Sequence, residues 1–70
     1  MIAQPAITLN GSPHPIPGPI TLERLLETLD LAGKPVVVEL NEQAVFPRDY
    51  PCTLVDNGAR IEIVTLAAGG

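Results

Sequence analysis

Aromatic and cysteine side chains are almost absent from this sequence. Among its 70 residues only Phe46 and Tyr50 are aromatic, and Cys52 is the single cysteine. One cysteine excludes an intrachain disulfide bond and a tetrahedral cysteine-rich metal site. Because apolar residues still make up 46 % of the chain, we expect a core built from aliphatic side chains.

Positive charge is also scarce. The four Lys and Arg residues are outnumbered by eight Asp and Glu, which gives a formal net charge of −4. Binding driven by nucleic-acid phosphates needs clustered Lys and Arg, whereas these four are scattered along the chain. We therefore expect no nucleic-acid partner. An acidic surface suits a protein partner with a basic docking face, or it serves solubility alone.

Long apolar runs are missing as well. No segment is long enough to span a membrane, and the first five residues lack both the basic region and the apolar run of a signal peptide. We expect a soluble cytoplasmic protein that forms one domain, residues 1–70. So short a chain builds one small core and has few walls for a deep catalytic cleft. The length favours a carrier or binding role over an enzyme.

The first half of the chain predicts a hairpin and a helix. Residues 6–9 alternate as a strand does, and Asn10-Gly11 favours a tight turn into a short return strand at residues 14–16. Its prolines confine that return strand to a sheet edge or make it short. Thr21 is expected to cap a helix that ends near Gly33. Its apolar face consists of Leu22, Leu25, Leu26 and Leu29.

The second half predicts three more strands. Residues 36–40 are rich in β-branched side chains, residues 44–46 suit a short strand, and residues 60–66 alternate into a last strand. Residues 47–51 are expected to form a loop or a single helical turn. The order of elements indicates an α+β fold, with a mixed four- to five-stranded sheet packed on one main helix.

Residues 67–70 carry no side chain larger than a methyl group. We expect residues 66–70 to be a flexible tail. Ala67, Ala68 and Gly69 can thread a narrow channel in a partner, which places the carboxylate of Gly70 in a buried active site. A carboxylate is a poor electrophile, so adenylation by ATP would have to activate it before sulfur replaces the leaving group. On this interpretation Gly70 holds a thiocarboxylate, and all catalysis belongs to partners.

No other residue is expected to carry chemistry. His14 stands alone between prolines and is interpreted as a solvated residue, because a metal site needs more ligands. Cys52 has no activating neighbour in sequence apart from Arg48, and single cysteines commonly fill a core. We therefore predict no catalytic residue and no metal ligand in this chain.

A series of motifs resembles the ThiS family of thiamin-biosynthesis sulfur carriers. The resemblance covers nearly the whole chain and implies a β-grasp, ubiquitin-like fold. It implies that Gly70 is adenylated by a ThiF-type enzyme that uses ATP, receives sulfur from a sulfur-donor protein, and passes it to thiazole synthase of the ThiG type. The chain itself would bind no cofactor. The motifs are Asn10-Gly11, the Thr21 helix, Val38-Glu39-Leu40-Asn41, Val45-Phe46-Pro47-Arg48, Asn57-Gly58 and residues 61–70.

Three alternatives remain open from the sequence. The small subunit of molybdopterin synthase shares the fold, the tail and the thiocarboxylate, although the length and the segment from Asn41 to Arg48 favour the thiazole carrier. A ubiquitin-like modifier would be joined to lysines of other proteins. A plain interaction domain would carry Gly69-Gly70 without using it.

Overall fold

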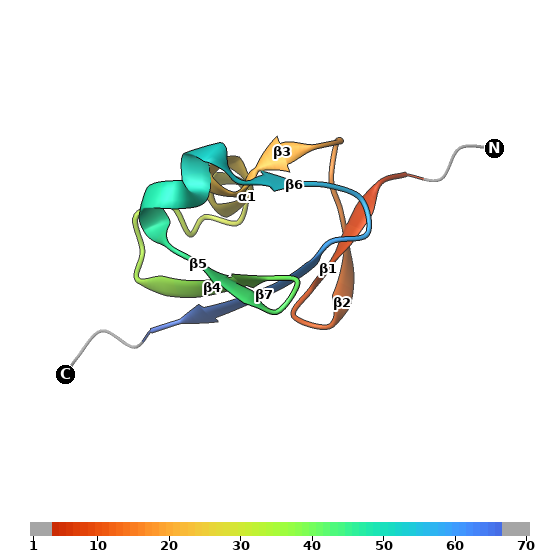
Figure 1. Ribbon diagram of the computed structural model, residues 1–70. Helices are drawn as coiled ribbons and strands as arrows, with labels where there is room; N and C mark the ends of the chain where they lie inside the picture. Colours follow the sequence, from red (N-terminus) through yellow and green to blue (C-terminus); the bar gives the residue numbers. More distant parts are fainter. Residues whose placement is uncertain (1–3, 67–70) are drawn as a thin grey trace.

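The main feature of the structure is a mixed five-stranded sheet with one helix across one face (Figure 1). The computed structural model describes residues 4–66. The elements are β1 Ala6–Leu9, β2 Ser12–Pro15, β3 Ile20–Thr21, α1 Leu22–Thr28, β4 Val36–Leu40, β5 Gln43–Val45, the 3-10 helix η1 Pro47–Cys52, β6 Leu54–Val55 and β7 Arg60–Thr65. The order of strands in the sheet is β2-β1-β7-β4-β5, and within it only β1 and β7 run parallel.

The N-terminal hairpin forms as its turn residues predict. Asn10 and Gly11 join β1 to β2 with φ angles of +49° and +84°, the left-handed region that Asn and Gly tolerate best. Strand β2 lies at the edge of the sheet. Within residues 4–66 no further strand pairs with its outer side, so the missing N–H groups of its prolines break no hydrogen bond there. The return strand ends at Pro15, so Ile16 is not part of it; Ile16 is buried in the core instead.

The helix begins where predicted and ends earlier. The Thr21 hydroxyl accepts a hydrogen bond of 3.1 Å from the Arg24 amide, as a helix cap does. The predicted end near Gly33 is wrong, because α1 stops at Thr28 and Asp30 turns left-handed with φ +60°. The Leu31 amide then donates to the Leu26 carbonyl at 2.8 Å, and the Asp30 amide donates to the Glu27 carbonyl at 3.1 Å. These two bonds form a Schellman motif with aspartate in the place where glycine is commoner.

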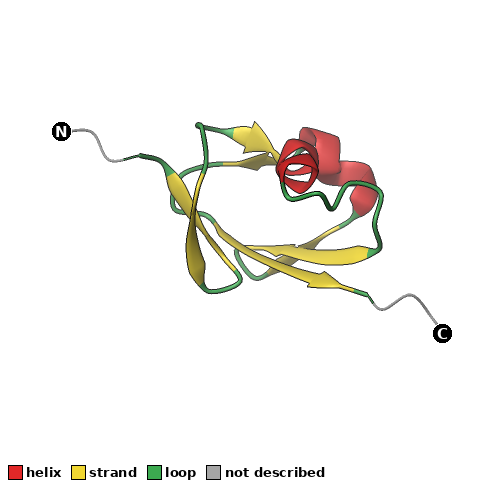
Figure 2. Cartoon of the chain, turned by 180° about the vertical axis from the view of Figure 1, so that it is seen from behind, coloured by secondary structure: helices red, strands yellow, loops and turns green. Residues whose placement is uncertain are grey.

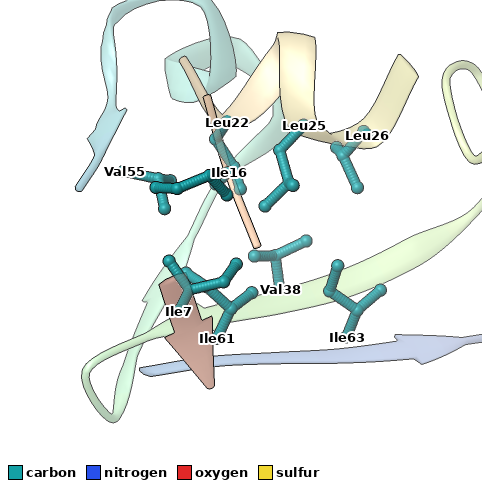
Figure 3. Packing of buried hydrophobic residues seen from close by; sticks show 9 residues of the cluster. All are labelled: Ile7, Ile16, Leu22, Leu25, Leu26, Val38, Val55, Ile61 and Ile63. Carbon is teal, nitrogen blue, oxygen red and sulfur yellow. The ribbon is translucent and has the colours of Figure 1, made fainter. Parts of the chain in front are cut away.

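The core is entirely aliphatic, as the composition predicts. It fills the space between the helix and the inner face of the main sheet (Figure 3). Leu22, Leu25 and Leu26 enter it from the helix side, and strands β1, β4 and β7 supply the opposite side. The remaining buried residues are Ile7, Ile16, Val38, Val55, Ile61 and Ile63.

A second, two-stranded sheet was not predicted. Strands β3 and β6 pair antiparallel, with Ile20 opposite Val55, and lie on the helix side of the main sheet (Figure 1). The segment expected to be a loop or a helical turn forms η1. No helix among residues 4–66 has the length and apolar character needed to cross a membrane.

Candidate functional site

The four residues predicted to carry the function lie outside the described part of the chain. They are Ala67, Ala68, Gly69 and Gly70. The structure does place the strand that leads to them. Strand β7 is the middle strand of the main sheet, with β1 on one side and β4 on the other. Gly70 therefore follows the middle strand of the main sheet in the chain.

The pairing of β7 with β4 continues to the last described residue. Thr65 lies opposite Val36, and the Leu66 amide donates to the Pro35 carbonyl at 2.9 Å. Leu66 was expected to belong to a flexible tail that starts at residue 66, yet this hydrogen bond continues the ladder through it. The backbone direction at the end of β7 is therefore defined up to four residues before Gly70.

Among residues 4–66, no helix covers the outer face of the main sheet, which lies on the side away from α1 (Figure 2), and large apolar side chains are exposed there. Val37 of β4 and Val64 of β7 lie directly opposite each other and are 44 % and 59 % exposed. Phe46 directly follows Val45, which pairs with Val38 next to Val37, and it is 59 % exposed. Leu66 follows Val64 by two residues, on the same face of the strand, and is 51 % exposed. We call Val37, Phe46, Val64 and Leu66 the outer patch.

Charged groups border the outer patch. Glu39 and Glu62 lie directly opposite each other on the same outer face, and neither belongs to an ion pair among the described residues. Like charges opposite each other on adjacent strands are destabilising. The guanidinium carbon of Arg48 lies 5.4 Å from the centre of the Phe46 ring, a cation–π contact. The outer face thus offers an apolar surface beside two unpaired carboxylates, which fits a partner that is apolar and basic.

The remaining candidates form no reactive cluster. Cys52 was expected to fill the core, which is wrong: it is exposed in η1, and its thiol donates to the Asp49 carbonyl at 3.3 Å. His14 is half-buried on β2. Within residues 4–66, no three His, Cys, Asp or Glu side chains are placed to hold a metal ion. Burial raises the pKa of the Tyr50 hydroxyl, which is enclosed without a hydrogen-bond partner.

Comparison with known proteins gives consistent matches along the whole described fold. The model of the ThiS family matches residues 7–70. The sulfur carrier protein ThiS of Thermus thermophilus is 38 % identical over 64 residues, which cover 91 % of this chain and 98 % of that protein. The uncharacterized protein ycf40 of Porphyra purpurea is 29 % identical over 65 residues, which cover 93 % of this chain and 92 % of ycf40.

The solved structures agree with the β-grasp prediction. The crystal structure of the thiamine biosynthesis protein ThiS from Geobacter metallireducens matches with a TM-score of 0.79 at 29 % identity, covering 93 % of this chain and 99 % of that one. A solution structure of a thiamine biosynthesis protein from the same organism matches with a TM-score of 0.77 at 29 % identity, covering 93 % and 87 %.

Proposed function

This chain belongs to the ThiS family and is a non-catalytic sulfur carrier of thiamine biosynthesis, and we propose that it holds its sulfur as a thiocarboxylate on Gly70. The observation that carries the proposal is the family match, which runs through the glycine pair to residue 70. Residues 1–70 act as one carrier domain, and Ala67, Ala68 and Gly69 form the part that enters the active sites of partners.

The chemistry at Gly70 proceeds in two displacements. A carboxylate oxygen of Gly70 attacks the α-phosphorus of ATP, and pyrophosphate leaves, which gives an acyl adenylate. A sulfur atom at the oxidation level of sulfide then attacks the acyl carbon. The carbon–sulfur bond forms as the carbon–oxygen bond to AMP breaks, and AMP takes the bonding pair. The product is a thiocarboxylate, whose sulfur is nucleophilic but is not released as free sulfide.

Three partners are needed for this cycle. A ThiF-type adenylating enzyme binds the ATP and activates Gly70, a sulfur-donor protein supplies the sulfur, and thiazole synthase of the ThiG type receives it. The cycle takes place in the cytoplasm, where ATP is available. The chain contributes the acyl group and the surface by which each partner recognises it.

Intact-mass measurement tests the proposal. The protein is incubated with a ThiF-type enzyme, ATP and sulfide, and its mass is expected to rise by the difference between sulfur and oxygen. The gain is expected to lie in the C-terminal peptide and to depend on ATP. ThiS of Thermus thermophilus serves as the positive control. An unchanged mass under conditions in which that control is loaded would refute the proposal.

The outer patch is proposed to dock on the adenylating enzyme. It is apolar, and β7 connects it directly to the residues that must enter the active site. Changing Val64→Gln is expected to raise the KM for the carrier about fivefold or more, because an amide buried in the interface without a hydrogen-bond partner costs about 1–3 kcal/mol. The kcat is expected to stay nearly constant, because the tail is unchanged.

Leu54→Gln provides the matched control for the docking experiment. Leu54 is 64 % exposed, similar to Val64 at 59 %, and it also lies on a strand. Strand β6 belongs to the small sheet on the helix side, away from the outer patch. The KM of Leu54→Gln is expected to match that of the unchanged protein. Equal KM values for the two variants would mean that docking occurs elsewhere.

A further inference from the structure

The backbone pairing between β1 and β7 stops well before β7 ends. The parallel register joins Thr8 to Arg60 and Leu9 to Ile61, and the Asn10 amide donates to the Ile61 carbonyl at 2.9 Å. The chain then turns away through Gly11 into β2. Without a further contact, the last part of β7 would be held on the β4 side alone.

Where the backbone ladder between β1 and β7 stops, the side chain of Asn10 forms the next hydrogen bonds to β7. Its Oδ1 atom accepts a hydrogen bond of 2.7 Å from the Ile63 amide, and its Nδ2 atom donates to the Ile63 carbonyl at 3.1 Å. A primary amide has the same donor and acceptor as a peptide group. Asn10 therefore replaces the strand residue that would have paired next, across 53 positions of sequence.

Ile63 is the last described residue that is fastened on this side. The N–H and C=O groups of successive strand residues point alternately toward the two neighbouring strands. Those of Ile61 and Ile63 point toward the β1 side, whereas the amide of Leu66 points toward Pro35, next to β4. The backbone groups of Thr65 point to the same side as those of Ile63, but the described pairing of β1 with β7 places no strand residue opposite Thr65. The side-chain amide of Asn10 therefore marks the point after which the described part of β7 has no hydrogen-bonded neighbour on its β1 side.

The backbone of Asn10 suggests that its side chain is needed. Its φ of +49° costs an asparagine more than a glycine, which adopts this region freely. Gly11 already supplies one glycine to the turn. An asparagine in this conformation gains the two bonds to Ile63, which glycine cannot make.

We infer that Asn10 is a positioning residue for sulfur loading, which fixes the direction in which β7 leaves the sheet and hence where Gly70 arrives in a partner. The inference rests on the function proposed above. The three described residues that follow Ile63, residues 64–66, span about 10 Å when extended. Over that length a 10° change of direction at Ile63 displaces Leu66 by about 2 Å, and a misplacement of 1 Å can slow a reaction about 100-fold.

Asn41 offers a matched control. It lies in the β4–β5 turn with the same φ of +49°, and its Oδ1 atom accepts a hydrogen bond of 2.9 Å from the Arg60 amide. Arg60 is the first residue of β7, so Asn41 holds the start of the strand rather than its end. Asn10→Gly and Asn41→Gly therefore relieve the same backbone strain and each detach one point of β7.

The experiment compares ATP-dependent thiocarboxylate formation by a ThiF-type enzyme, at a temperature at which both variants are shown by circular dichroism to be folded. Asn10→Gly is expected to lower kcat about tenfold with KM within twofold of normal. The docking surface is unchanged, whereas the Gly70 carboxylate is placed less accurately in the active site of the partner. Asn41→Gly is expected to keep both parameters within twofold. Amide hydrogen exchange should become faster at Ile63 in Asn10→Gly only.

Equal kcat values for Asn10→Gly and Asn41→Gly would overturn the inference and leave the carrier function standing. A failure to load the unchanged protein would instead overturn the proposed function. If Asn10→Gly does not fold, Asn10→Asp replaces it, since aspartate tolerates the turn and keeps the acceptor for the Ile63 amide but loses the donor. Its kcat is expected to fall between those of the unchanged protein and the tenfold loss, and an unaltered kcat would count against positioning by Asn10.

Discussion

Deletion of Gly70 is expected to abolish sulfur transfer while the fold survives. The new terminal carboxylate, on Gly69, would stop about 3.5 Å short of its normal position, which is far outside the tolerance for an in-line displacement. The described core cluster runs from Ile7 to Ile63, and β7 ends at Thr65, so the deletion removes no core residue. Intact mass after incubation with ATP and sulfide should stay constant, and the far-ultraviolet circular dichroism spectrum should be unchanged.

Two further proteins separate chain length from the reacting group. Amidation of the Gly70 carboxylate keeps the length but removes the oxygen that attacks ATP, so it should block loading as completely as the deletion. Ala68→Gly keeps both the length and the carboxylate, and loading should remain close to normal. Thiazole formation supported by the amidated protein would contradict the assignment of the cargo to Gly70.

The elements that the sequence predicts well are those with a regular pattern over four or more residues. Strands β4 and β7 alternate inward and exposed positions, β1 alternates larger apolar residues with Ala6 and Thr8, and the helix repeats leucine at intervals of three and four. Strands β3 and β6 were missed because each has only two residues. Two residues carry no periodicity, and this sheet exists because Ile20 and Val55 meet in the folded chain.

The end of the helix shows how a local signal is overridden. Gly33 is the obvious stop signal and does adopt a φ of +75°, but it acts in the turn after the helix. The Leu31 side chain packs against the core, and its amide donates to the Leu26 carbonyl. The helix therefore ends at Thr28, five residues before Gly33. Leu31 is partly buried against the core at the point where Asp30 turns left-handed, and a local propensity for Gly or Asp does not register this tertiary contact.

The proposed functional residues differ in the same way in how far the sequence predicts them. Gly69-Gly70 could be proposed as the sulfur-carrying end from residue types alone, and the family model matches the chain through residue 70. The outer patch was not predicted, because alternation shows that Val37 and Val64 share a face but not that this face lacks a covering helix. Asn10 was predicted only as a turn residue. Its bonds to Ile63 depend on a parallel pairing of the two ends of the chain.

Leu25→Ala is expected to destabilise the protein by about 2–5 kcal/mol, the cost of a buried cavity at a leucine. Leu25 is fully buried, with 0 % of its surface exposed, between the helix and the sheet. At about 0.05–0.15 kcal/mol per residue, a chain of this length has a total stability of about 3.5–10 kcal/mol. The substitution therefore removes a large share of the total, and urea unfolding should show a much lower midpoint or an unfolded protein.

Leu54→Ala makes the same chemical change at an exposed site and provides the comparison. Leu54 is 64 % exposed, so its truncation should alter the free energy of unfolding by less than about 0.5 kcal/mol. Similar losses for both variants would mean that Leu25 does not anchor the helix to the sheet. If Leu25→Ala lowers stability as expected, loading of Gly70 should fall in proportion to the folded fraction, with an unchanged kcat for the molecules that remain folded. Deletion of Gly70 is expected to behave differently, because it removes loading from a fully folded protein. The comparison therefore distinguishes a residue that stabilises the fold, such as Leu25, from Gly70, the proposed site of the thiocarboxylate.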